Sequence, residues 1–186
     1  MYQSYKAHEH LMLRSILSTA PKFTGECVHN GTKTTVESAY FTGKYTIILF
    51  YPSNFVQSTA EELLALDQSL SEFERLNCTL LVITPDSIES QTAWYRAPLE
   101  SNGLGGSVRF PLLSDKTFSV CRAYGVLRED KGVPLRSLFI LDPLQKIRVV
   151  LSMDVGIMYD ISEILRIVKY LTDLDNRPSR NDAKKA

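Results

Sequence analysis

The sequence has little cysteine and no cysteine motif. Its three cysteines, Cys27, Cys78 and Cys121, are far apart and form neither a C-x-x-C pair nor a metal-ligand spacing. This pattern argues against a structural zinc site, and the odd number argues against a disulfide framework. We therefore expect unpaired thiols in a reducing compartment, and a protein that uses no metal or cofactor.

An excess of one charge and long apolar runs are also missing. Lys and Arg together number 21, as do Asp and Glu, so the formal net charge is zero. This balance gives no reason to expect nucleic acid as a partner. No apolar stretch approaches the roughly 20 residues that a membrane helix needs, so no membrane partner is expected either. A chain of 186 residues is long enough to bury the core of one domain.

The two ends of the chain differ from the rest in composition. Residues 1–19 contain Lys6 and Arg14, several hydroxyl residues and a single acid, Glu9. We expect a short arm that leads into the first strand of a cytoplasmic protein. The alternative is a weak organellar targeting segment, which would make the protein mitochondrial. Residues 177–186, "RPSRNDAKKA", are polar and are expected to form a disordered tail.

Between the ends, apolar periodicity predicts alternating strands and helices. The expected elements are a β-hairpin region before residue 45, a strand at 45–50, a helix at 59–77, a strand at 78–85, a helix from residue 87 that Pro98 ends, a short helix that Gly125 ends, a hairpin at 135–154 and a helix at 160–174. The first strand, helix and strand form a parallel crossover unit. Ser58 or Thr59 is expected to cap the first helix, with acids in its first turn.

Seven stretches, in order and at matching spacing, resemble peroxiredoxins of the typical two-cysteine group. They are "APKF", "GKYTIILFYPSNF", "EFERLNCTLLVITPDS", "TAWYRAPLESNGLG", "FPLLSDKT", "YGVLREDKGVPLRSLFILD" and "ISEILRIVKYL". The resemblance covers one domain, residues 20–176. It implies an α/β protein with the thioredoxin-like fold of peroxiredoxin type, in which helices flank both faces of a central mixed β-sheet.

The family signature P-x-x-x-T-x-x-C identifies the candidate site residues. By this resemblance, Pro52 matches the proline, Val56 stands in place of the threonine, and Thr59 stands in place of the peroxidatic cysteine. Glu62 matches the glutamate that follows the cysteine, and Arg136, in "LRSLF", matches the arginine that supports the thiolate and the peroxide. The sequence therefore keeps the proline, glutamate and arginine of the signature but lacks its nucleophilic cysteine.

Other positions also lack residues that the family uses at its active site. Ala60 replaces the proline that usually follows the cysteine, and Tyr159 stands where a further family arginine is expected. The resolving cysteine and the C-terminal Tyr-Phe motif are both missing from the end of the sequence. Pro52, Val56, Thr59, Glu62 and Arg136 are thus predicted to form a vestigial pocket.

Threonine cannot take over the chemistry of a peroxidatic cysteine. Its hydroxyl stays protonated near neutral pH and has no counterpart of the sulfenic acid cycle. Hydrolase chemistry at Thr59 would need an adjacent base, and the three histidines all lie in the first 29 residues. The leading hypothesis is a catalytically degenerate peroxiredoxin with a structural, regulatory or chaperone-like role.

Such a subunit is expected to form a homodimer or a higher oligomer, or a hetero-oligomer with active peroxiredoxins. The segment "IRVVLS", residues 147–152, is a strong β-former near the end of the domain. An exposed edge strand of this kind is usually paired or covered. We expect it to pair with its copy across a two-fold axis.

Two rival hypotheses use other residues. A relocated thiol peroxidase or redox sensor would use Cys121, which is next to Arg122, or Cys27, which is expected in an exposed hairpin. Cys78 opens an apolar strand and is expected to be a buried structural residue. An anion-binding module would instead use a pocket at Arg136.

The residues of that last pocket also have a structural interpretation. Arg136 and Glu62 could form a packed ion pair that maintains the fold and the oligomer geometry. Trp94 and the tyrosines are expected to be core or interface anchors.

Overall fold

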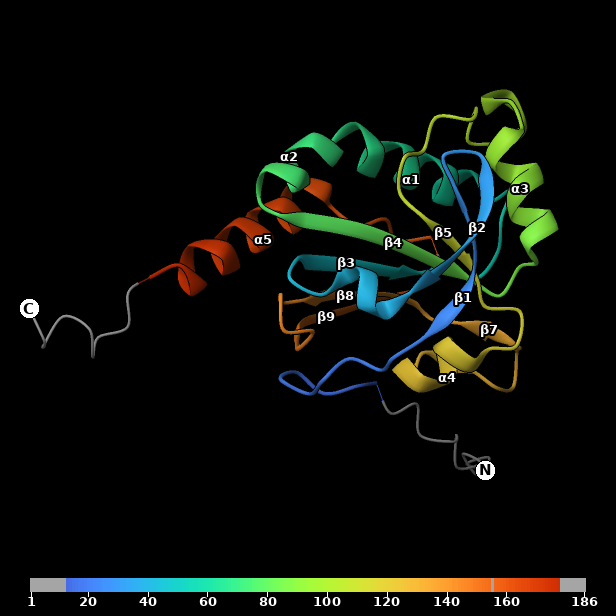
Figure 1. Cartoon of the computed structure of the whole chain (residues 1–186). Helices are drawn as coiled ribbons and strands as arrows, with labels where there is room; N and C mark the ends of the chain where they lie inside the picture. Colours follow the sequence, from blue (N-terminus) through green and yellow to red (C-terminus); the bar gives the residue numbers. More distant parts are fainter. Residues whose placement is uncertain (1–12, 155, 178–186) are drawn as a thin grey trace, which may run out of the picture.

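The computed structural model describes residues 13–154 and 156–177 (Figure 1). The predicted tail, apart from its first residue, and the first twelve residues of the predicted arm lie outside these ranges. The described part of the arm lies against the turn before the last strand. The amide of Leu17 donates to the carbonyl of Ile147 at 2.7 Å, and the amide of Ala20 donates to the carbonyl of Gln145 at 2.8 Å.

A seven-stranded mixed sheet forms the centre of the molecule, with strand order β2-β1-β5-β4-β3-β8-β9. The strands are β1 (Thr24–His29), β2 (Thr32–Glu37), β3 (Tyr45–Phe50), β4 (Cys78–Thr84), β5 (Leu112–Ser114), β8 (Arg136–Leu141) and β9 (Ile147–Met153), and a separate small ladder pairs β6 (Leu127–Arg128) with β7 (Val133–Pro134). The β3–β4 and β4–β5 pairs are parallel, and the other neighbouring strands are antiparallel. The predicted parallel crossover and mixed sheet are confirmed.

Helices cover both faces of this sheet, as predicted (Figure 1). One face packs against α1 (Gln57–Gln68), α2 (Leu70–Arg75), α3 (Ile88–Arg96) and α5 (Ile161–Asp175). The other packs against α4 (Ser119–Tyr124) and the 3-10 helix η1 (Ser38–Phe41), and a second 3-10 turn, η2 (Leu99–Ser101), follows α3. All six residues of β3 are buried because alternate side chains enter the two cores.

The start of the first helix differs from the prediction. Helix α1 begins at Gln57, so its N-cap is Val56, which makes no side-chain capping bond. Thr59 therefore lies inside the first turn and is buried, and the expected N-cap role of Ser58 or Thr59 is wrong. The expected acids in the first turn are also absent from it, because the earlier start moves Glu62 into the second turn.

The predicted single helix at 59–77 is divided in two. Ser69, with φ −90° and ψ 0°, separates α1 from α2. Leu70 and Phe73 of α2 are buried in the core between the helices and the sheet. The other predicted helix ends are confirmed: α3 stops before Pro98, and Gly125, with φ +70°, ends α4.

No helix among the described residues is long and apolar enough to cross a membrane.

A polar network fastens the end of α5 to the sheet. Asp175 Oδ2 accepts hydrogen bonds from the hydroxyl of Tyr45 on β3 at 2.5 Å and from Nη1 of Arg148 on β9 at 2.8 Å. Arg148 also lies 3.5 Å from Asp142, in the turn between β8 and β9. The hydrogen bond from Arg148 is the main reason that the pKa of Asp175 lies below its ordinary value.

We predict that this network makes the stability of the protein depend on acid pH. A carboxyl whose folded pKa is lowered stabilises the fold above its unfolded pKa, near 3.9, and the contribution is lost as pH falls through the folded pKa. Asp175→Asn should therefore lower the melting temperature at neutral pH by a few degrees, as order of magnitude, and lower it less at acid pH. Asp173→Asn, on the same exposed turn, is the matched control. Equal losses for Asp175→Asn at both pH values would contradict the prediction.

Candidate functional site

The segment between β3 and α1 carries the predicted signature and is held rigidly. The hydroxyl of Tyr51 donates to Oδ1 of the buried Asn54 at 2.7 Å. The backbone amide of Asn54 donates to Asp86 at 2.6 Å, and its side-chain amide donates to Ser90 at 3.1 Å. Pro52 lies half-buried within this segment. These bonds tie the signature to the loop after β4 and to the start of α3.

The residues just before α1 are unusually exposed and strained. Phe55 has φ +59°, a left-handed conformation that is unfavourable for a bulky side chain. Phe55 is 43% exposed and Val56 is 40% exposed. The ring of Phe55 lies 6.4 Å from that of Trp94, which is fully buried and donates from Nε1 to the carbonyl of Asn102 at 2.7 Å. The prediction that Trp94 is a core anchor is confirmed.

Three buried residues from distant parts of the chain meet beside the second turn of α1. Nη2 of Arg136, on β8, lies 2.5 Å from Oε2 of Glu62, on α1. Tyr159, just before α5, donates its backbone amide to Oε1 of Glu62 at 2.8 Å. We call Glu62, Arg136 and Tyr159 the buried cluster.

Tyr159 completes the cluster with its side chain as well. Its hydroxyl donates to the carbonyl of Arg136 at 3.1 Å and lies 3.3 Å from the carbonyl of Leu151 on β9. The guanidinium of Arg136 lies 5.8 Å from the centre of the Tyr159 ring, and its Nε donates to the carbonyl of Ile157 at 3.1 Å. The cluster thus joins α1, β8, β9 and the segment before α5.

Burial dominates the electrostatics of the cluster. It raises the pKa of Glu62 above its ordinary value, although the amide of Tyr159 and the charge of Arg136 act in the opposite direction. Nη2 of Arg136 and Oε2 of Glu62 meet off the line of an ideal hydrogen bond, and no other described residue bonds to either atom. Each charge therefore depends on the other for its compensation.

The three thiols are all buried. Cys27 lies on β1 and is fully buried, so the expectation that it sits in an exposed hairpin is wrong, because β1 is paired on both sides, with β2 and β5. Burial raises the pKa of its thiol to about 11. Cys78, the first residue of β4, is buried as predicted, and burial also raises the pKa of its thiol.

The charge of Arg122 acts on the Cys121 thiol, but larger effects outweigh it. Burial, and then the nearby carboxylate of Asp115, raise the pKa of its thiol. The guanidinium of Arg122 is directed to Glu129, with its Nε 2.6 Å from a carboxylate oxygen. Residues that adjoin in a helix point in different directions, so adjacency in sequence did not place the charge on the thiol.

The described part of the chain contains no cluster of metal-ligand side chains. No group of three or more His, Cys, Asp or Glu side chains there could hold a metal ion.

Sequence reasoning missed several residues that shape the site. Tyr159 was expected only as a lost arginine, whereas its amide and hydroxyl bind two members of the cluster. Asn54 and Asp86, which hold the signature segment, were not singled out, and neither was Asp115, which accepts hydrogen bonds from the amides of Val120 and Cys121 on α4. Glu62 and Tyr159 are 97 residues apart in sequence, so no local pattern could reveal their contact.

We predict that the cluster behaves as a coupled ion pair. Arg136→Met should lower the free energy of unfolding by about 3–5 kcal/mol, because it leaves the Glu62 carboxyl buried without its partner. The double variant Arg136→Met, Glu62→Leu should recover most of this loss. Chemical denaturation measures both, and Arg96→Met, at an exposed site on α3, is the control. Additive losses in the double variant would contradict the coupling.

Comparisons with known proteins agree with this fold. Residues 16–150 match the model of the AhpC/TSA family. The chain is 37% identical to peroxiredoxin 2 of Drosophila melanogaster over 150 residues, which cover 81% of this chain and 77% of that protein. It is 36% identical to the mitochondrial thioredoxin-dependent peroxide reductase of Rattus norvegicus over 155 residues, which cover 83% of this chain and 60% of that protein.

A solved structure extends the agreement to three dimensions. The reduced 2-Cys peroxiredoxin of Plasmodium vivax superposes with a TM-score of 0.83 at 31% identity, covering 89% of this chain and 88% of that one. The chain therefore belongs to the AhpC/TSA family, the peroxiredoxins, and has their thioredoxin-like fold.

Proposed function

We propose that this chain is a peroxiredoxin-family protein without thiol peroxidase activity, which acts as a structural, regulatory or chaperone-like subunit of an oligomer. The observation that carries the proposal is the side chain at the start of α1. Thr59, at the position that the family resemblance assigns to the attacking cysteine, is buried in the first turn. Several relatives are named thioredoxin-dependent peroxide reductases, and that activity is not proposed for this chain.

The chemistry of peroxide reduction explains why this substitution matters. A thiolate attacks the O–O bond, a sulfur–oxygen bond forms, and the departing oxygen leaves as water or alcohol after it gains a proton. The thiolate must be anionic and accessible, so it needs a nearby positive charge. A threonine hydroxyl stays protonated near neutral pH and that of Thr59 is buried, so it meets neither requirement.

The rival proposal of a relocated thiol gains no support from the geometry. A reactive cysteine is partly exposed and has a lowered pKa. Cys27 and Cys121 are buried, and the pKa of each thiol is raised. Both thiols are better described as small apolar side chains that fill the core of the sheet face covered by α4.

The anion-binding alternative is also weakened. Arg136 is 4% exposed, and its guanidinium contacts Glu62, the carbonyl of Ile157 and the face of Tyr159. An incoming anion would have to displace the Glu62 carboxylate. We therefore favour the packed ion pair for this position.

The oligomer proposal rests on the two edges of the sheet. Strand β2 is a polar edge, with Lys33 among three threonines, and such an edge resists pairing. Strand β9 is the apolar edge, and the arm covers only its start through Ser18 and Ile147. In the described part of the chain no strand pairs with β9 on its outer side, so residues 148–153 are available to pair with a second copy or with an active relative.

The compartment remains a prediction. The three unpaired thiols favour a reducing environment, which suits the cytoplasm. The Rattus norvegicus relative is named as mitochondrial, and the mitochondrial alternative stays open for this chain.

We predict no thiol-dependent peroxide turnover by the purified protein. Hydrogen peroxide should persist in the presence of dithiothreitol or of thioredoxin and its reductase, and iodoacetamide should modify the native thiols no faster than a thiol of pKa about 8.5 reacts. Unfolded protein, in which all three thiols react, is the control. Turnover that is abolished by Cys121→Ser or Cys27→Ser would overturn the proposal in favour of a relocated thiol.

The variant Thr59→Cys separates a lost nucleophile from a dismantled site. Because position 59 is buried and Tyr159 stands where the resemblance expects a second arginine, we expect the Thr59→Cys thiol to react slowly with peroxide. We expect the same slow reaction when Thr59→Cys is combined with Val56→Thr and Ala60→Pro. Stopped-flow measurement of sulfenic acid formation tests both. Fast reaction of either variant would mean that only the nucleophile was lost.

We predict that β9 mediates self-association. Val150→Lys should shift the protein toward the monomer in sedimentation experiments, because a charge on this edge disfavours strand pairing. Thr34→Lys, on the polar edge strand β2, is the matched control. A wild-type protein that stays monomeric at high concentration, alone and mixed with an active peroxiredoxin, would refute the subunit role.

A further inference from the structure

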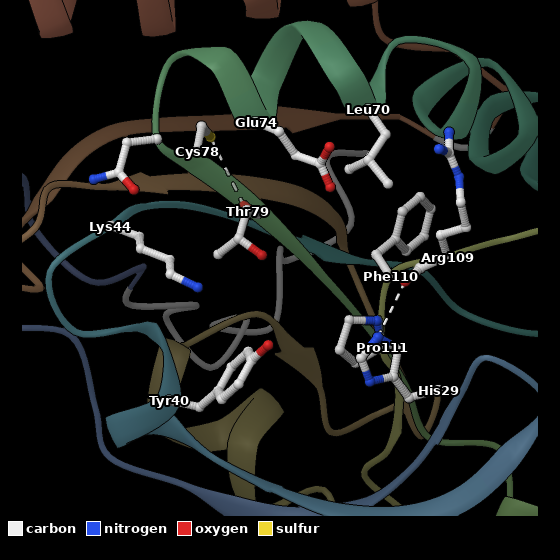
Figure 2. A pocket seen from close by; sticks show the side chains of 11 residues that line it. His29, Tyr40, Lys44, Leu70, Glu74, Cys78, Thr79, Arg109, Phe110 and Pro111 are labelled. Carbon is white, nitrogen blue, oxygen red and sulfur yellow. Dashed lines mark hydrogen bonds between the residues drawn. The ribbon is translucent and has the colours of Figure 1, made fainter.

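A hollow lies at the end of the sheet where the parallel strands β3, β4 and β5 begin (Figure 2). Its volume is about 220 Å³, below the range of about 300–1,000 Å³ for drug-sized ligands, which limits it to a small ligand. It is lined by residues at the amino ends of the parallel strands, such as Lys44 before β3, Thr79 on β4 and Pro111 before β5. Thr59 follows the carboxyl end of β3, so the two sites are separate.

The walls of the hollow are fixed by hydrogen bonds. The side-chain amide of Asn77 donates to the carbonyl of Gly43 at 2.9 Å, which holds the loop carrying Lys44 beside β4. On the opposite wall, Nε2 of His29 donates to the carbonyl of Arg109 at 3.1 Å. Nε of Arg109 lies 3.2 Å from both carboxylate oxygens of Asp67. The hollow is therefore formed before any ligand arrives, which lowers the cost of binding.

Two opposite charges in the hollow are not used by the fold. Lys44 has no carboxylate partner among the described residues, and its charge lies 5.1 Å from the centre of the Tyr40 ring. Glu74, on α2, likewise forms no ion pair within residues 13–154 and 156–177. Figure 2 shows both side chains pointing into the same space, with Thr79 between them.

Part of the remaining lining is apolar, and its polar part consists of His29, Asn77, Thr79 and Arg109. Leu70 and Phe110 are buried and lie together at one side of the hollow, near Pro111 (Figure 2). The ring of Tyr40 borders the opposite side, below Lys44. A matching ligand therefore needs an anionic group, a cationic group and an apolar group in one small molecule.

We propose that this hollow binds a small zwitterion with an apolar side chain, namely a free amino acid or the equivalent part of a short peptide. Its carboxylate pairs with Lys44, its ammonium group pairs with Glu74, and its side chain packs on Leu70 and Phe110. A lone anion would meet the repulsion of Glu74, and a lone cation would meet that of Lys44. The proposal is independent of whether the chain reduces peroxide.

The experiment uses the full isotope-labelled chain, L-phenylalanine as the probe and two-dimensional NMR as the readout. We expect saturable shifts of the amides of Tyr40, Thr79 and Phe110, with a dissociation constant on the order of 1 mM. Hydrocinnamate, which lacks the ammonium group, and phenethylamine, which lacks the carboxylate, should each bind about tenfold more weakly or not at all.

Charge-neutralising variants assign the two contacts. Lys44→Met and Glu74→Gln should each weaken binding of L-phenylalanine about tenfold, whereas Lys44→Met should strengthen binding of phenethylamine because the repulsion of its ammonium group is removed. Lys116→Met and Glu72→Gln, at exposed sites outside the lining, are the matched controls, and the NMR spectrum of each variant reports its folding. Absence of saturable shifts at the lining amides, or equal affinity for hydrocinnamate and L-phenylalanine, would overturn the proposal.

Discussion

The buried ion pair between Glu62 and Arg136 is the constraint on which the site depends. Both charges are nearly inaccessible to water, so each would be costly without the other. The backbone amide of Tyr159 donates a hydrogen bond to the Glu62 carboxylate, and its hydroxyl donates one to the carbonyl of Arg136 on β8. The consequence is mechanical as well as electrostatic, because α1 can move relative to the sheet only by separating these charges. The signature segment, held separately through Asn54, is thus anchored at both of its ends.

The substitutions around this pair account for the chemistry that we propose to be missing. In an active thiol peroxidase, positive charge must be available to a thiolate at the start of this helix. Here the position of the thiolate holds Thr59, and Tyr159 stands where the resemblance expects a second arginine. The buried thiols elsewhere have raised pKa values, chiefly because burial disfavours their charged form. What remains is a stable family scaffold whose binding capacity would lie at its edges, in the β9 strand and in the hollow beside Lys44.

The sheet explains why these regions can be independent. Its parallel strands β3, β4 and β5 all begin at one end of the sheet and finish at the other. The signature follows the carboxyl end of β3, while the hollow with Lys44 and Glu74 lies where the parallel strands begin. The two regions share no residue, so a family member can lose an activity at one end while it keeps or gains a binding site at the other.

The sequence by itself determined the fold class, the mixed sheet and most helix ends, because apolar periodicity, Pro98 and Gly125 act locally. It also identified the Glu62–Arg136 pair, through a resemblance that spans the domain. Only the tertiary structure decided the start of α1, the burial of Cys27 and the role of Tyr159. A helix start depends on which residues the core will accept, so Thr59 went inside instead of capping. The environment of a thiol or a carboxylate is set by neighbours that are tens of residues away, and neither spacing nor composition records them.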